Sequence, residues 1–404
     1  MSESSPAIIN ASRHSALEVF LAFLRLGCIS FGGPVAHLSY FREEFVARRG
    51  WLNEHSYADL VALCQFLPGP ASSQVGIGLG LFRSGLSGAV AAWLGFTLPS
   101  AVLLVIFGLL LRQSGLHTDA AWLHGLKVMA VAVVAQAVWA MGRSLCPDRS
   151  RATLALLSAM LVSVLPSAWT PIGVIVLGAL IGRMWLRPQQ ALPHAPFPIQ
   201  FSKRVGVILL TTTIALLIGL PWVAHESGNQ AVQLFDRFFR AGALVFGGGH
   251  VVLPVLQTEV VAPGWVSNQT FLAGYGAAQA IPGPLFTFAA YLGAVSSALP
   301  NGWPGAAIAL VAIFLPGFLL VLAMLPLWDV ARVHPSMQQA VMGINAAVVG
   351  LLLAALYNPV WTSAIHTSAD FALALMAFML LVFWKVPPWL VAIACALAGA
   401  SGWL

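Results

Sequence analysis

The chain has 404 residues, of which 59% are hydrophobic and only 8% are charged, and its formal net charge is +6. Because a soluble domain carries roughly 25% charged residues, this composition excludes an ordinary water-soluble protein. The basic residues are scattered and most fall in short loops, which argues against nucleic-acid binding and matches the positive-inside pattern of membrane proteins.

Apolar runs near or above about 20 residues recur along the chain, and each is long enough to cross a bilayer as a helix. Lipid offers backbone groups no hydrogen-bond partner, and the sequence shows no series of short alternating strands. An all-α integral membrane protein with about 12–13 transmembrane segments is therefore predicted. The segments lie near residues 15–35, 56–82, 85–111, 120–142, 152–166, 170–186, 205–224, 232–253, 269–298, 303–327, 337–357, 369–384 and 387–404.

The polar, proline-rich stretch from Arg187 to Lys203 is typical of a linker. It predicts a first repeat over residues 1–186, a linker with one odd helix over 187–231, and a second repeat over 232–404. If the first repeat crosses the membrane six times, the odd helix places the second repeat in the inverted orientation. The basic stretch 41–49 agrees with this topology only if its glutamates offset its arginines, or if the first segment re-enters the membrane instead of crossing it.

The two repeats carry matching sequence elements, which is the pattern expected of a membrane transporter. The matches pair residues 20–38 with 235–253, 65–70 with 279–284, Trp51 with Trp265, and Leu98-Pro99 with Leu315-Pro316.

Arg25 and its counterpart Arg240 lie inside apolar segments, seven residues before a pair of glycines. An arginine at membrane depth costs roughly 2.5–3.5 kcal/mol on insertion scales, so it normally faces a cavity, a partner or a ligand. Its planar fork suits an oxyanion, and we expect both arginines to bind the substrate. The alternatives are snorkelling to a head group, or structural pairs with Glu18 and Asp236.

Glycine-rich elements follow both arginines. Adjacent glycines let the chain leave a helix and bring its backbone close to a ligand, although close helix packing also uses small residues. The predicted binding residues here are Gly32, Gly33 and Pro34 in the first repeat, and Gly247, Gly248, Gly249 and His250 in the second.

A Pro-Gly-Pro element interrupts segments two and nine, so each is predicted to be two half-helices and not one rod. A half-helix that begins at mid-membrane offers free N–H groups to an anion, while the alternative is a kink that only aids packing. The predicted binding residues are Gln65, Pro68, Gly69, Pro70, Ser72, Ser73, Gln279, Pro282, Gly283, Pro284 and Thr287.

The cysteines predict no metal site, since Cys28, Cys64, Cys146 and Cys395 lack ligand spacing. No paired histidines suit haem or a metal, and no Gly-rich nucleotide fingerprint follows a strand. The sequence therefore predicts no cofactor and no enzymatic activity.

Together, the doubled FGGP/FGGGH and QxxPGP elements in a two-half chain resemble the chromate transporter family in its long, bidomain form. The resemblance covers nearly the whole chain. It implies a prokaryotic inner-membrane protein that exports chromate, confers resistance and draws on the proton-motive force. Its motif positions fall on Arg25, Phe31, Gly32, Gly33, Pro34, Gln65, Pro68, Gly69 and Pro70, and on Phe246, Gly247, Gly248, Gly249, His250, Pro282, Gly283 and Pro284.

The expected mechanism places a tetrahedral dianion between the halves, near the midplane of the lipid bilayer, with alternating access around it. Two alternatives remain open. One is transport of sulfate or another anion, because similar tetrahedral dianions make the same hydrogen bonds. The other is a membrane-embedded enzyme that modifies its substrate. A homodimer and a monomer are equally compatible with the sequence.

Overall fold

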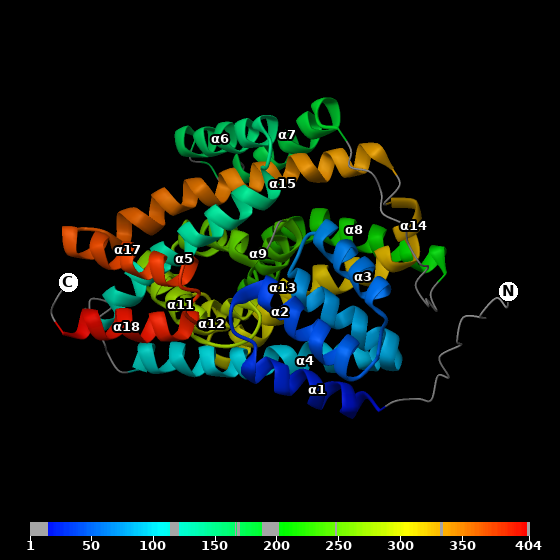
Figure 1. Ribbon diagram of the computed structural model, residues 1–404, viewed down its shortest axis with the longest axis horizontal. Helices are drawn as coiled ribbons and strands as arrows, with labels where there is room; N and C mark the ends of the chain where they lie inside the picture. The colour runs from blue at the N-terminus through cyan, green and yellow to red at the C-terminus, as the bar shows by residue number, and fades with distance from the viewer. Residues whose placement is uncertain are drawn as a thin grey trace.

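The structure, a computed structural model, describes residues 15–113, 121–165, 167, 170–187, 202–246, 249–331 and 334–401. These residues contain helices and no strand, which confirms the predicted all-α fold (Figure 1). Five helical stretches have the length and apolar character of a membrane span. The helices are α1 (Ala16–Ile29), α2 (Gly33–Phe41), η1 (Arg42–Arg48), α3 (Glu54–Phe66), α4 (Ala71–Gln113), α5 (Ala121–Leu145), α6 (Arg149–Val164), α7 (Thr170–Trp185), α8 (Lys203–Ser227), α9 (Gln230–Leu244), η2 (Gly249–Val251), α10 (Val252–Leu256), η3 (Gln257–Val261), α11 (Asn268–Ala280), η4 (Leu285–Thr287), α12 (Phe288–Val295), α13 (Gly302–Met324), η5 (Leu325–Leu327), α14 (Trp328–Ala331), α15 (Pro335–Ala355), η6 (Leu356–Trp361), α16 (Thr362–Ala364), α17 (Ser368–Val382) and α18 (Pro388–Ala400).

The first apolar segment of each repeat folds back on itself at its glycines. In the first repeat, the ring of Phe23 in α1 stacks on that of Phe45 in η1 at 4.6 Å. At the open end of this hairpin, Arg49 Nη1 lies 3.8 Å from Glu18 Oε1. We call this the first glycine hairpin, and α9 with η2, α10 and η3 forms the second. The basic stretch 41–49 therefore lies at the same end as the start of α1, which resolves its conflict with simple segment counting.

The Pro-Gly-Pro elements are the tips of two further hairpins. Gly78 in α4 packs on α3, because a methyl group there would lie 2.7 Å from Leu60 Cδ1. In the second repeat, Tyr291 of α12 donates a hydrogen bond to the Thr270 carbonyl of α11 at 2.9 Å. α3 has 13 residues, so it rises about 20 Å and cannot cross a core about 30 Å thick. The predicted half-helices are confirmed, and we call these pairs the proline hairpins.

α4 is two helices joined at a sharp bend. Ser84 and Gly85 leave helical geometry, and the helices on either side pack closely at Gly80 and Gly88. α12 and α13 make the same close approach in the second repeat. The longer helix after each bend has a span's length, and the shorter one before it belongs to a proline hairpin.

The two repeats interlock through reciprocal helix packing. α5 of the first repeat packs on α17 and α18 of the second, while α15 of the second packs on α6 and α7 of the first (Figure 1). Such exchanged contacts are those of a two-fold axis. They hold whichever way the repeats face the membrane, so the inverted orientation stays a prediction. α8 has no counterpart: it packs on α9 and α13 and leaves most of its apolar surface exposed.

Candidate functional site

The four hairpin tips meet across the two repeats. The N–H of Gly69 donates to the carbonyl of Val245 at 2.6 Å, and the N–H of Gly283 donates to the carbonyl of Ser30 at 3.0 Å. Ser30 and Val245 occupy equivalent positions just before the glycine elements. Each proline hairpin therefore binds the glycine hairpin of the other repeat. We call this meeting point the crossing.

The two-fold axis passes through the glycine hairpins. Pro34 and Gly249 are equivalent positions in the two repeats, and a methyl group on Gly249 would lie 3.5 Å from Pro34 Cγ. Next to this contact, a methyl group on Gly33 would lie 3.9 Å from His250 Nε2. The His250 ring is held by its other nitrogen, whose Nδ1 lies 2.9 Å from the Tyr275 hydroxyl. The predicted residues Gly33, Pro34, Gly249 and His250 are thus brought together at the axis.

Both central glycines of the Pro-Gly-Pro tips have backbone conformations that L side chains rarely adopt, with φ of +117° at Gly69 and +112° at Gly283. A methyl group on Gly69 would lie 3.4 Å from Gly317 Cα, and one on Gly283 would lie 2.7 Å from Ser100 Oγ. Gly317 and Ser100 each follow a repeated Leu-Pro pair and belong to the opposite repeat. The backbone conformation therefore requires glycine at both tips, and the Ser100 side chain adds a steric reason at Gly283.

The helix that begins at the first proline tip presents unused hydrogen-bond donors. The first helical bond of α4 runs from Gln74 N–H to Pro70 O at 2.9 Å, so the amides of residues 71–73 precede it. The buried Ser73 hydroxyl has no hydrogen-bond partner among the described residues. Ser72 Oγ lies 3.3 Å from His37 Nδ1. An uncapped helix start with a free hydroxyl offers donors of the kind that suit an anion.

The second proline tip offers less. The hydroxyl of Thr287 donates to the carbonyl of Pro284 at 2.7 Å and is thereby used within its own turn. Gln279 contributes a buried amide nitrogen with no acceptor among the described residues, whereas Gln65 is exposed in α3. Gly32 is exposed, and Gly247 and Gly248 lie outside the described residues.

Sequence reasoning missed His37 and Gln74 at the crossing. His37 Nε2 lies 3.2 Å from the carbonyl of Ser30. Gln74 donates to the carbonyl of Pro68 at 2.8 Å, and its own side-chain oxygen is buried without a partner. A comparison of the two repeats could have indicated these positions. His37 corresponds to Val252 in the second repeat, and Gln74 corresponds to Phe288.

The paired arginines have unequal surroundings. Arg25 is exposed on the outer face of α1, which also carries Leu21 and Ile29 at 54% and 45% exposure. It forms no ion pair with a described residue, because Glu18 instead lies 3.3 Å from Arg83. The shared anion role expected for Arg25 and Arg240 is not supported by these positions.

Arg240 is held between two buried carboxylates. Its Nη1 donates to Glu259 at 2.7 Å and its Nη2 donates to Asp236 at 3.0 Å. The alternative interpretation of Arg240, a structural pair with Asp236, therefore fits its geometry. Because both carboxylates neutralise the guanidinium, it offers little unmet charge to a substrate.

A buried glutamate recurs in both glycine hairpins, and sequence reasoning missed this repeat. Glu44 in η1 accepts from Arg49 at 2.6 Å, and Glu259 in η3 occupies the equivalent position. Both lie in π-helical turns, and the repeated tryptophans Trp51 and Trp265 lie beneath arginines nearby. The spacing that relates Arg25 to Arg240 also relates the two glutamates and would have revealed them. These clusters close the base of each glycine hairpin.

The groups gathered at the crossing are neutral donors: backbone amides, serine hydroxyls, an amide side chain and imidazoles. Buried neutral donors at helix starts replace the hydration shell of an anion without needing a matching cation. The geometry therefore suits an anion that passes between the repeats.

Comparisons with known proteins find relatives that match nearly the whole chain. A "Chromate transport protein" of Pseudomonas aeruginosa is 29% identical over 408 residues, covering 96% of this chain and 92% of the relative. A "Probable chromate transport protein" of Synechococcus elongatus is 27% identical over 420 residues, covering 96% of both chains. A "Chromate transport protein" of Cupriavidus metallidurans is 26% identical over 404 residues, covering 97% of this chain and 94% of the relative. No solved structure matches the chain.

The family model described as "Chromate transporter" matches residues 17–183 and again 232–400, one match for each repeat. The internal repeat is thereby confirmed. The chain belongs to the chromate transporter family.

Proposed function

We propose that this protein exports chromate from the cytoplasm across the inner membrane and so confers chromate resistance. The observation that carries the proposal is the crossing, where Gly69 and Gly283 each bind the opposite repeat and bring four hairpin tips together. The relatives that are named chromate transport proteins support the choice of anion.

The dianion is proposed to bind at the start of α4, against the free amides of residues 71–73 and the unpartnered hydroxyl of Ser73. His37 and His250 lie beside this position and the two-fold axis, respectively. Two half-helix starts and polar side chains then replace the hydration shell, and movement of the repeats about the crossing exposes the site alternately to each side.

The membrane potential supplies a driving force for export. A potential that is negative inside favours anion exit by about 2.3 kcal/mol per charge per 100 mV, and a dianion gains twice this amount. The groups named at the crossing include no carboxylate, so the simplest coupling is to the potential. Coupling to protons is the competing arrangement and predicts a flux that follows a pH gradient at zero potential.

The test is chromate uptake into inverted membrane vesicles with an imposed lumen-positive potential. We expect potential-driven accumulation by the wild-type protein and at least a tenfold lower rate for Ser73→Ala, because one hydrogen bond to a charged group is worth about 1.5–3 kcal/mol. Thr287→Ala is the matched control, since its hydroxyl is already bonded to Pro284. Excess sulfate is added in a parallel arm: complete inhibition with sulfate uptake of its own would transfer the proposal to sulfate. Absence of flux from well-folded wild-type protein would refute it.

A further inference from the structure

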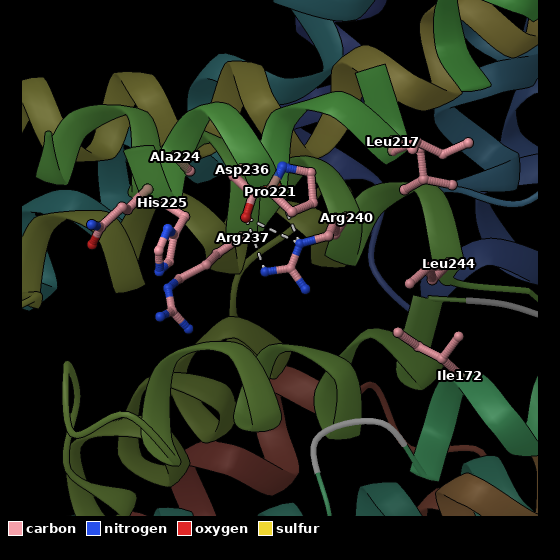
Figure 2. A pocket seen from close by; sticks show the side chains of 11 residues that line it. Ile172, Leu217, Pro221, Ala224, His225, Asp236, Arg237, Arg240 and Leu244 are labelled. Atoms are coloured by element: carbon pink, nitrogen blue, oxygen red, sulfur yellow. Dashed lines mark hydrogen bonds and ion pairs between the residues drawn. The ribbon is translucent and has the colours of Figure 1, made fainter. Parts of the chain in front are cut away.

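A cavity of about 590 Å³ lies between α8, α9 and the start of α7, and none of the hydrogen-bonded residues of the crossing lines it. Figure 2 shows that its lining is divided into two ends. One end carries His225, Arg237 and Arg240, while the other carries Leu217, Leu244 and Ile172. The space is therefore amphipathic, with hydrogen-bond donors at one end and hydrocarbon at the other.

The two ends lie at different depths along α8. This helix ends at Ser227, so His225 is in its last turn, while Leu217 is eight residues earlier and about 12 Å further along the helix. Trp222, which does not line the cavity, is 70% exposed on α8. Tryptophan concentrates at the membrane interface, so the polar end lies at head-group level and the apolar end at the depth of the acyl chains.

Arg237 is the cation with unused donors at the polar end. Its Nη1 donates to the main-chain carbonyl of Glu259 at 2.8 Å and lies 3.8 Å from the carboxylate of that residue. Its guanidinium lies 4.5 Å from the ring centre of Trp265, which fixes its orientation. Nε and Nη2 have no hydrogen-bond partner among the described residues. The amide of Gln233, also in the lining, has none either, and the largely exposed His225 ring lies 3.5 Å from Glu226.

We infer that this cavity binds one phospholipid of the bilayer, with its phosphodiester at Arg237 and Gln233 and an acyl chain along Leu217 and Leu244. An arginine fork matches two phosphate oxygens, and basic pockets between transmembrane helices bind lipid head groups. The bound lipid fills the gap between α9 and α8, the helix that has no counterpart in the other repeat.

The same geometry disfavours a free oxyanion here. The apolar end offers a small dianion no donor, and Arg240 is already neutralised by Asp236 and Glu259. The cluster of two arginines and two carboxylates is neutral in sum, so recognition rests on the free donors of Arg237 and not on net charge. A ligand that needs both a phosphate and a hydrocarbon chain satisfies both ends.

The experiment is native mass spectrometry of delipidated protein in detergent with three separate probes: dioleoyl phosphatidylglycerol, dioleoyl glycerol and glycerol 3-phosphate. The first carries phosphate and chains, the second only the chains, and the third only the phosphate. We expect one phosphatidylglycerol per chain, with the other probes bound at least about tenfold more weakly. Equal binding of dioleoyl glycerol would overturn the phosphate contact, and displacement of the lipid by glycerol 3-phosphate or chromate would show an anion vestibule instead.

Variants locate the bound lipid. Arg237→Gln should weaken retention about tenfold, and Ala224→Phe, which fills the cavity from α8, should abolish it. Arg143→Gln is the matched control, because Arg143 also lies over a tryptophan but outside the cavity. Unchanged retention by both cavity variants would place the lipid elsewhere and overturn the inference. The experiment measures the mass of the bound lipid. A negative result would therefore overturn the lipid inference without bearing on whether the protein transports chromate.

Discussion

Replacement of Gly283 by alanine tests the crossing directly. The φ of +112° costs an alanine about 1–3 kcal/mol, and the new methyl group would lie 2.7 Å from Ser100 Oγ, which adds about 1–3 kcal/mol of overpacking. The free energy of unfolding should therefore fall by about 2–6 kcal/mol. Because the Gly283 N–H also joins the repeats, chromate flux should fall with stability.

A second substitution separates the two contributions. Ser100→Gly removes the atom in the way, and the opposite repeat already has glycine at the corresponding Gly317. It should relieve the overpacking but not the backbone strain, so the double variant should recover about 1–3 kcal/mol relative to additivity. Ser100→Gly alone should cost about 1 kcal/mol through helix propensity.

Thermal unfolding in detergent, followed by tryptophan fluorescence, measures these effects alongside vesicle flux. Gly142→Ala is the control, because Gly142 lies in α5 with no atom within 4 Å of the added methyl group. It should be neutral or slightly stabilising. The close approach at this tip would be refuted if Gly283→Ala kept the wild-type melting temperature and flux. It would also be refuted if the effects of the two substitutions were strictly additive in the double variant.

Three further outcomes follow from the same contacts. Glu259→Gln should lower the free energy of unfolding by about 1–3 kcal/mol, and adding Arg240→Gln should cost less than the sum of both changes in a thermal-unfolding cycle. Ser73→Ala should reduce chromate flux more than Thr287→Ala at equal protein stability, as measured in vesicles. Arg25→Ala should retain most of the wild-type flux, since its side chain is exposed among apolar residues; complete loss would return Arg25 to the site.

Local signals in the sequence correctly predicted the interrupted helices. Two prolines around a glycine cannot continue a helix, so the breaks at Gly69 and Gly283 followed from backbone chemistry alone. The partner of each break was not predictable in this way. Gly69 binds Val245 and Gly283 binds Ser30, and these pairings join distant parts of the chain, so local sequence carries no signal for them.

The surroundings of Arg25 and Arg240 differ although their sequence positions match. Among the described helices, α8 packs on α9 and has no counterpart beside α1. Arg240 therefore borders a cavity, while the Arg25 side chain is exposed. Each arginine also needs its own counter-charge. Glu44 accepts from Arg48 and Arg49, whereas Glu259 accepts from Arg240. The carboxylate of Glu259, which lies 19 residues after Arg240 in the chain, is therefore part of what sets the surroundings of that arginine.

The two repeats also differ in the side chains that they place at the crossing, and this difference bears on where the anion binds. The backbone framework is symmetric, since the two tip glycines make equivalent bonds. The side chains on that framework are not: Ser73 and Gln74 occupy the positions of Thr287 and Phe288, and the Thr287 hydroxyl is turned inward to Pro284. Because free donors concentrate at one proline tip, the repeat provides the architecture and the first half provides most of the polar contacts. Divergence between the halves after duplication is therefore expected to be greatest in side chains that bind the anion, and smallest at Gly69 and Gly283.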